Sequence, residues 1–271
     1  RLNDWKRVVD AKLNPKKKVS IAVVGKYVDL KDSYKSLNEA LDHAGIVNLA
    51  KVEIHMIDAA KITRGNVAKV LKSYQAVLVP GGFGSRGIEG MIYACQFARE
   101  NKLPYFGICL GMQIAIIEFS RNVLKLKNAN STEFNPKTKY PVIGLVTEWK
   151  DASGKIEHRN ENSNLGGTMR LGGQKCLIKK SSLSHKLYKK LTVTERHRHR
   201  YEVNPEFKKE LVASGMDIVG TSMDGNLAEM IEIKKHPWFL GCQFHPEFTS
   251  NPRDGHPIFN DFIAKAIKIK R

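Results

Sequence analysis

The chain has 271 residues, of which 42% are hydrophobic, and Lys plus Arg outnumber Asp plus Glu by 45 to 27, giving a formal net charge of +18. This length suits one α/β domain. The sequence has no run of about 18 apolar residues and no signal-peptide pattern at its start, so we expect a cytoplasmic protein without a membrane partner. The positive charges are scattered and lack interleaved aromatic residues that stack on bases, which argues against a nucleic-acid partner and for a solvated lysine-rich surface.

The first residues, 1–18, are polar and lysine-rich, and we predict a short helix and a linker there. Because Arg1 is not a methionine, we expect the chain to be part of a longer polypeptide, with the domain itself spanning residues 19–271. Strands are predicted at 19–24, 52–57, 76–79 and 105–108, and helices at 33–43, 67–73 and 88–100. Alternating strands and helices predict a doubly wound, mostly parallel sheet.

The second half of the chain predicts strands with few helices between them, and therefore an antiparallel flank. The expected strands lie at 142–147, 166–171, 174–178, 218–222, 230–233 and 239–244, and a closing helix lies at 258–267. Residues 150–164 are polar and rich in Gly, Asn and Ser, so we predict an exposed loop of low order.

The segment 105–113, YFGICLGMQ, is an apolar strand that runs into G-x-C-x-G and then into a helical pattern. This is the pattern of a nucleophile elbow with Cys109 in place of serine, and flanking glycines remove Cβ atoms that would clash at so sharp a turn. A thiolate at a helix N-terminus is stabilised by the helix dipole. The alternative is a buried structural cysteine, and none of the four cysteines forms a C-x-x-C pair, so reduced thiols are expected.

A partner for this thiol is found far downstream, in QFHPE at 243–247. Side chains two apart on an extended segment share a face, so Glu247 can accept the Nδ1 proton of His245 and leave Nε2 for the thiol of Cys109. A surface turn is the alternative for an isolated His-Pro-Glu. A metal site built on Cys242 and His245 is disfavoured because positions three apart on a strand face opposite sides, so no metal is expected.

The glycine-rich loop at 80–87, PGGFGSRG, fits G-x-G-x-x-G, a pattern typical of dinucleotide binding. However, the next strand ends in Cys109 rather than in a carboxylate for a ribose, and Ile88 and Glu89 stand where a P-loop needs Lys and Ser or Thr. We therefore predict an oxyanion hole made by the backbone N–H groups of Gly82 and Leu110.

Several further segments resemble one known family. They are LNDW at 2–5, GKY at 25–27, DSY at 32–34, GGFG at 81–84, RG at 86–87, ANSTEF at 129–134, GGTMRLG at 166–172 and RHRYEVN at 198–204. With the Cys-His-Glu pattern, the chain resembles the class I (triad) glutamine amidotransferase domains, and more narrowly those of the CTP synthase family. The resemblance covers nearly the whole chain and implies the flavodoxin-like fold of that class.

The resemblance also implies how L-glutamine is bound. Glu133 would meet its ammonium group and Arg200 its carboxylate, because a zwitterion needs one anion and one cation. The remaining implied contacts are Gly82, Phe83, Leu110, Gly111, Met112, Gln113 and Tyr201. Taken singly, Glu133 and Arg200 would be interpreted as ordinary surface charge, and only the resemblance to the family favours a role in binding.

In the family, ammonia passes to an N-terminal amidoligase domain that uses ATP and Mg²⁺ to aminate UTP, with GTP as allosteric activator, in a full-length homotetramer. No cofactor is implied for the glutaminase domain itself. Residues 1–18 would then be the linker from that amidoligase domain. Two other hypotheses stay open: a free-standing γ-glutamyl cysteine hydrolase, and a non-catalytic nucleotide-binding module.

Overall fold

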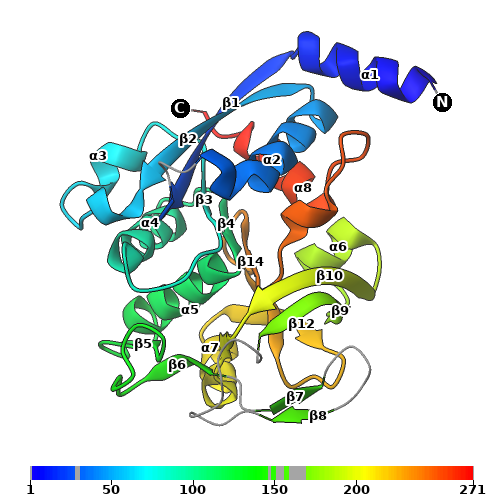
Figure 1. Cartoon of the computed structure of the whole chain (residues 1–271). Helices are drawn as coiled ribbons and strands as arrows, with labels where there is room; N and C mark the ends of the chain where they lie inside the picture. Colours follow the sequence, from blue (N-terminus) through cyan, green and yellow to red (C-terminus); the bar gives the residue numbers. More distant parts are fainter. Residues whose placement is uncertain (1, 28–30, 146–147, 151–155, 159–168, 271) are drawn as a thin grey trace.

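The computed structural model describes residues 2–27, 31–145, 148–150, 156–158 and 169–270. Its centre is a nine-stranded sheet with the order β10-β9-β12-β13-β14-β4-β3-β1-β2 (Figure 1). The five parallel strands are β1 (Lys17–Gly25), β2 (Ala50–Asp58), β3 (Ala76–Val79), β4 (Tyr105–Ile108) and β14 (Phe239–Cys242). Their order, 2-1-3-4-14, is the flavodoxin-like order, so the predicted doubly wound sheet is confirmed.

The predicted antiparallel flank is also confirmed. It consists of β13 (Ala228–Ile233), β12 (Met216–Ser222), β9 (Arg170–Ile178) and β10 (Thr192–His199). A small second sheet has the order β11-β6-β5 and is formed by β5 (Asn130–Ser131), β6 (Pro141–Leu145) and β11 (Tyr201–Val203). This second sheet lies beside helix α5 (Figure 1).

Helices cover both faces of the large sheet and bury two separate apolar clusters against it. On one face lie α3 (Val67–Leu71), α4 (Ile88–Glu100), α5 (Leu110–Asn122) and α7 (Lys208–Ala213). On the other lie α2 (Lys35–Val47), α6 (Leu183–Tyr188) and α8 (Pro257–Ala266), while α1 (Leu2–Leu13) packs on α2 at the outer edge (Figure 1). Among the described residues, no helix is both long and apolar enough to cross a membrane.

Some predicted elements differ from the structure. The two strands expected at 166–171 and 174–178 form one strand, β9, because Gly172 accommodates a φ of 87° and the chain continues without a turn; residues 166–168 lie outside the described part. Inside the loop predicted at 150–164, β8 (Ile156–His158) pairs with β7 (Glu148–Lys150), and the remaining residues of that loop are not described. Residues 146–147 of another predicted strand are not described either.

Candidate active site

The turn between β4 and α5 places Cys109 at a strained backbone position, with φ 53° and ψ −103°. Its two glycines are required by close packing: a Cβ on Gly107 would lie 2.5 Å from the carbonyl of Gly111, and a Cβ on Gly111 would lie 2.0 Å from the carbonyl oxygen of Val79. A positive φ on a non-glycine residue costs on the order of 1–3 kcal/mol and is characteristic of functional sites. The structure therefore has the nucleophile elbow that the G-x-C-x-G pattern predicts.

The backbone of Cys109 is held in place by a hydrogen bond to β14 and by its position at the start of α5. Its N–H donates to the carbonyl of Cys242 on β14 at 2.7 Å, and it is the N-cap residue of α5. The N–H groups of Leu110 and Gly111 belong to the first turn of α5 and have no carbonyl partner within the helix, whereas those of Met112 and Gln113 donate to the carbonyl of Cys109 at 3.1 and 3.3 Å.

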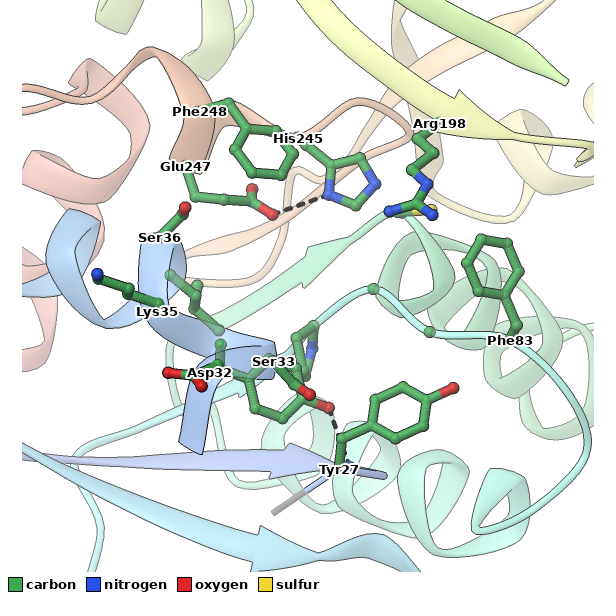
Figure 2. Close-up of a pocket in the computed structure, with 16 residues that line it drawn as sticks. Tyr27, Asp32, Ser33, Lys35, Ser36, Phe83, Arg198, His245, Glu247 and Phe248 are labelled. Atoms are coloured by element: carbon green, nitrogen blue, oxygen red, sulfur yellow. Dashed lines mark hydrogen bonds and ion pairs between the residues drawn. The ribbon is translucent and has the colours of Figure 1, made fainter. Parts of the chain in front are cut away.

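His245 and Glu247 form the second half of the predicted triad. Nδ1 of His245 lies 2.8 Å from Oε1 of Glu247, as the dashed line in Figure 2 shows. The predicted reason for this pairing, a shared strand face, was wrong, because the two residues do not lie on a strand. β14 ends at Cys242 rather than at residue 244, and Pro246 begins a 3₁₀ turn (Pro246–Thr249) that brings the two side chains together.

Gly81 lies beside both His245 and Cys109. A Cβ built on Gly81 would be 2.8 Å from Cε1 of His245 and 3.5 Å from Cβ of Cys109, so the two side chains flank the same backbone position. Burial alone would lower the pKa of His245, but the neighbouring Cys109 and Glu247 raise it from 6.5 to about 10. Its Nε2 is buried, and the interaction of the ring with the Cys109 side chain is among the causes of the raised pKa, so the imidazole is placed for proton transfer with the thiol.

A small hollow of about 30 Å³ opens beside Cys109 on the side of the second sheet. It is lined by Gly82, Phe83, Cys109, Gln113, Glu133, His199, Arg200 and Tyr201. Six of the predicted glutamine contacts therefore meet in one place: Gly82, Phe83, Gln113, Glu133, Arg200 and Tyr201. Leu110, Gly111 and Met112, which were also predicted, do not line it.

Gln113 has a structural task in the wall of this hollow. Its Nε2 donates to the carbonyl of Tyr201 at 2.9 Å and to Oε1 of Gln243 at 3.2 Å. Nε2 of Gln243 in turn approaches Sγ of Cys109 at 3.7 Å. Gln243 was not predicted as a site residue, although it stands two positions before His245 and could have been considered for that reason.

On the other side of Cys109 lies a larger cavity of about 380 Å³, shown in Figure 2. His245, Glu247 and Phe248 form one wall, Tyr27 and the start of α2 form another, and Pro80 to Phe83 separate it from the smaller hollow. The cavity lies at the carboxyl ends of β1, β3 and β4, where the strand order reverses and where ligands bind in doubly wound folds.

Behind the small hollow is a buried charged cluster. Arg170 on β9 donates to Oε1 of Glu202 at 2.5 Å and to Oε1 of Glu229 at 2.8 Å. The same Glu202 oxygen lies 2.6 Å from Nε2 of His199, a residue that lines the hollow. Burial raises the pKa of Glu229 to about 7, while Arg170 opposes this shift, and burial lowers the pKa of His197 well below its usual value.

No group of His, Cys, Asp and Glu in the described ranges is arranged to hold a metal ion.

Comparisons with known proteins identify the family and the fold of this chain. Residues 29–265 match the family Glutamine amidotransferase class-I. The chain is similar to the solved glutaminase domain of Trypanosoma brucei CTPS with bound acivicin, with 37% identity, a TM-score of 0.83, and coverage of 93% of this chain and 95% of that one. A glutamine amidotransferase from Methylobacillus flagellatus shares the fold at 9% identity and a TM-score of 0.50, over 85% of this chain and 70% of that one.

Proposed function

Because the chain belongs to the class I glutamine amidotransferase family, we propose that it is the glutaminase domain of a CTP synthase and hydrolyses L-glutamine to glutamate and ammonia. The observation that carries this proposal is the position of Cys109 between two hollows. One hollow offers an anion and a cation, Glu133 and Arg200, and the other contains His245 with Glu247. With Cys109 in this position, the charged groups of the first hollow can bind an amino acid, and the imidazole of the second can exchange protons with the reacting groups.

The reaction begins when the Cys109 thiolate attacks the side-chain amide carbon of glutamine. The negative charge that develops on the amide oxygen is stabilised by the N–H groups of Gly82 and Leu110, each such donor being worth about 3 kcal/mol. The imidazolium of His245 protonates the amide nitrogen, the C–N bond breaks, and ammonia leaves. His245, now neutral, takes a proton from water, which hydrolyses the γ-glutamyl thioester and restores the thiolate.

Recognition of glutamine rests on charge. Burial raises the pKa of Glu133, with Lys26 and Arg200 opposing the shift, so this carboxylate gains from the arrival of a substrate ammonium group. Arg200 offers a planar fork to the α-carboxylate. The backbone of the hollow, together with Phe83, Gln113 and Tyr201, would surround the rest of the molecule.

We assign the larger cavity to the exit of ammonia, because it begins at His245, which protonates the leaving group. In this proposal ammonia is used by an amidoligase domain of the same polypeptide, which binds ATP and Mg²⁺ and aminates UTP, with GTP as activator. The similarity over 93% of the chain to a CTPS glutaminase domain supports this assignment. A cytoplasmic location and a homotetrameric full-length enzyme complete the proposal.

The test compares two nitrogen sources in the polypeptide that carries both domains. Cys109→Ala should abolish CTP formation from glutamine and leave CTP formation from free ammonia at the wild-type rate. The matched control is Cys95→Ala, which alters a buried cysteine of α4 away from the site and should leave both rates unchanged. Loss of both activities in Cys109→Ala would contradict two separate sites. Efficient hydrolysis of γ-glutamyl peptides without a synthetase would instead favour a free-standing hydrolase.

A further inference from the structure

Lys26 has a buried charge that the proposed reaction does not explain. It follows the last residue of β1, is 2% exposed, and its backbone N–H donates to the hydroxyl of Tyr34 at 3.1 Å. Burial lowers the pKa of its ammonium group from 10.5 to about 8, although the charge of Glu133 works in the opposite direction. A methionine would fill the same space without this cost, so the ammonium group has a task that packing alone does not account for.

The ammonium group of Lys26 is directed at the glycine-rich loop. Its Nζ donates to the carbonyl oxygen of Phe83 at 3.0 Å and also donates to the carbonyl oxygen of Gly84. The Lys26 stem runs beside Gly82, because a Cβ on that glycine would lie 3.6 Å from Cδ of Lys26. One side chain therefore contacts two consecutive residues of the loop, Phe83 and Gly84, and passes beside a third, Gly82.

The peptide group between Phe83 and Gly84, whose oxygen accepts from Lys26, contacts an anion on its N–H side. The N–H of Gly84 donates to Oε1 of Glu133 at 2.8 Å. In a trans peptide the C=O and the N–H point in opposite directions, so the peptide between Phe83 and Gly84 has a cation on its oxygen and an anion on its hydrogen. If this peptide turned over, its oxygen would face the carboxylate and its N–H would face the ammonium group, which is doubly unfavourable.

This restraint matters because the loop has little rigidity of its own. Gly81 and Gly82 are free of the usual Cβ restrictions, and Gly84 has a φ of 76°. The N–H assigned to the oxyanion belongs to the Gly81–Gly82 peptide, which is separated from the clamped Phe83–Gly84 peptide by one peptide group. A donor stabilises a transition state only if it is already correctly oriented.

We propose that Lys26 is a positioning residue that, together with Glu133, clamps the Phe83–Gly84 peptide and so keeps the N–H of Gly82 directed at the oxyanion. This inference rests on the proposed glutaminase function. In this role Lys26 neither contacts glutamine nor transfers a proton. The clamp acts on the rate of the chemical step through the orientation of the loop.

The test uses the intact protein and Lys26→Met, with Lys61→Met as control because Lys61 is exposed and distant from the site. Active sites are counted by the incorporation of a glutamine-mimicking diazoketone at Cys109. For Lys26→Met, kcat per labelled site should fall by about 10-fold or more, since one misplaced oxyanion donor costs about 10²–10³. KM for glutamine and the rate of Cys109 alkylation by iodoacetamide should change less than about 3-fold, because the clamp does not act on binding or on the thiol.

A second variant tests the ammonium group itself. In Lys26→Ala, added propylammonium should restore kcat in a saturable manner, whereas tetramethylammonium, which has no N–H to donate, should not. An unchanged kcat per labelled site in Lys26→Met, or a loss found only in KM or only in the number of labelled sites, would overturn the clamp while leaving the glutaminase assignment intact. If the wild type neither hydrolyses glutamine nor takes the label, both proposals fail together.

Discussion

The imidazole of His245 lies directly against Gly81: a methyl group on that glycine would be 2.8 Å from Cε1 of the ring. Real Cβ atoms are essentially never this close to another heavy atom, so no side chain fits between the loop and the ring without movement of one of them. Because the Cβ of Cys109 would also lie only 3.5 Å from this methyl group, the placement of the imidazole beside Cys109 depends on the absence of a Cβ at Gly81.

Gly81→Ala should therefore displace the imidazole of His245 and lower kcat for glutamine hydrolysis by about 10²-fold, the cost of a misplacement near 1 Å. The control is Gly65→Ala, at an exposed turn where the nearest other atom would lie 4.0 Å from the new methyl. Steady-state glutamate release measures both variants. A Gly81→Ala enzyme as active as Gly65→Ala would show that the ring is not confined by this backbone.

Glu247→Gln should lower kcat by about 10²-fold or more, because the amide would keep the shape of the side chain but remove the charge that holds the His245 imidazolium. The charge of Glu247 is one of the causes of the raised pKa of His245, so that pKa should fall in the variant. NMR titration of the His245 ring protons measures the pKa directly. Glu206→Gln, which alters an exposed carboxylate, serves as control, and an unchanged His245 pKa would count against the pairing.

Arg170→Met should destabilise the fold by about 3–5 kcal/mol, because it leaves the carboxylates of Glu202 and Glu229 buried without their cation. Lys179→Met is the matched comparison: its side chain is 52% exposed, its ion pair with Asp217 spans 3.5 Å, and its loss should cost about 0–1 kcal/mol. Urea unfolding measures both changes in the free energy of unfolding. Equal costs for the two variants would contradict a stabilising role for Arg170.

The stability contributed by Lys26 should depend on pH with a defined sign. Because burial lowers its pKa to about 8, between pH 8 and 10.5 the unfolded chain keeps a proton that the folded chain has lost. The free energy of unfolding of the wild type, relative to Lys26→Met, should therefore rise across this window. The facing groups are Glu133, which opposes the shift, Arg86, which adds to it, and Tyr34, whose pKa is raised by burial. Urea unfolding of both proteins at several pH values tests this, and a flat or falling difference would contradict it.

In the parallel core, β3 and β4 could be predicted from the sequence because they are buried on both faces and appear as short, continuous apolar runs. The strand β10 could not be predicted in this way. It alternates between buried and exposed positions, but after Val193 its buried face carries Glu195, His197 and His199 rather than hydrophobic residues. Glu195 is tolerated there because Tyr188, seven positions away, and His256, 61 positions away, pair with its carboxylate.

The short helix α6 was missed for a related reason. Its first turn is held by Glu232 of β13, which accepts hydrogen bonds from the N–H groups of Leu183 and Ser184. A carboxylate at a helix N-terminus is stabilising, but here it comes from about 50 residues away and leaves no local signal. In the site, motif spacing predicted the Cys, His and Glu that the fold brings together, whereas the long-range contacts of Gln243 and Lys26 appeared only with the fold.

The role of Cys109 as the nucleophile of a glutaminase can be examined by exposing the protein to a glutamine-mimicking diazoketone and locating the adduct by mass spectrometry of its peptides. We expect one adduct per chain, on Cys109, prevented by excess L-glutamine. Cys95, Cys176 and Cys242 should stay unmodified because all three are buried and burial raises their pKa. An unmodified Cys109, or labelling that L-glutamine does not prevent, would contradict this role.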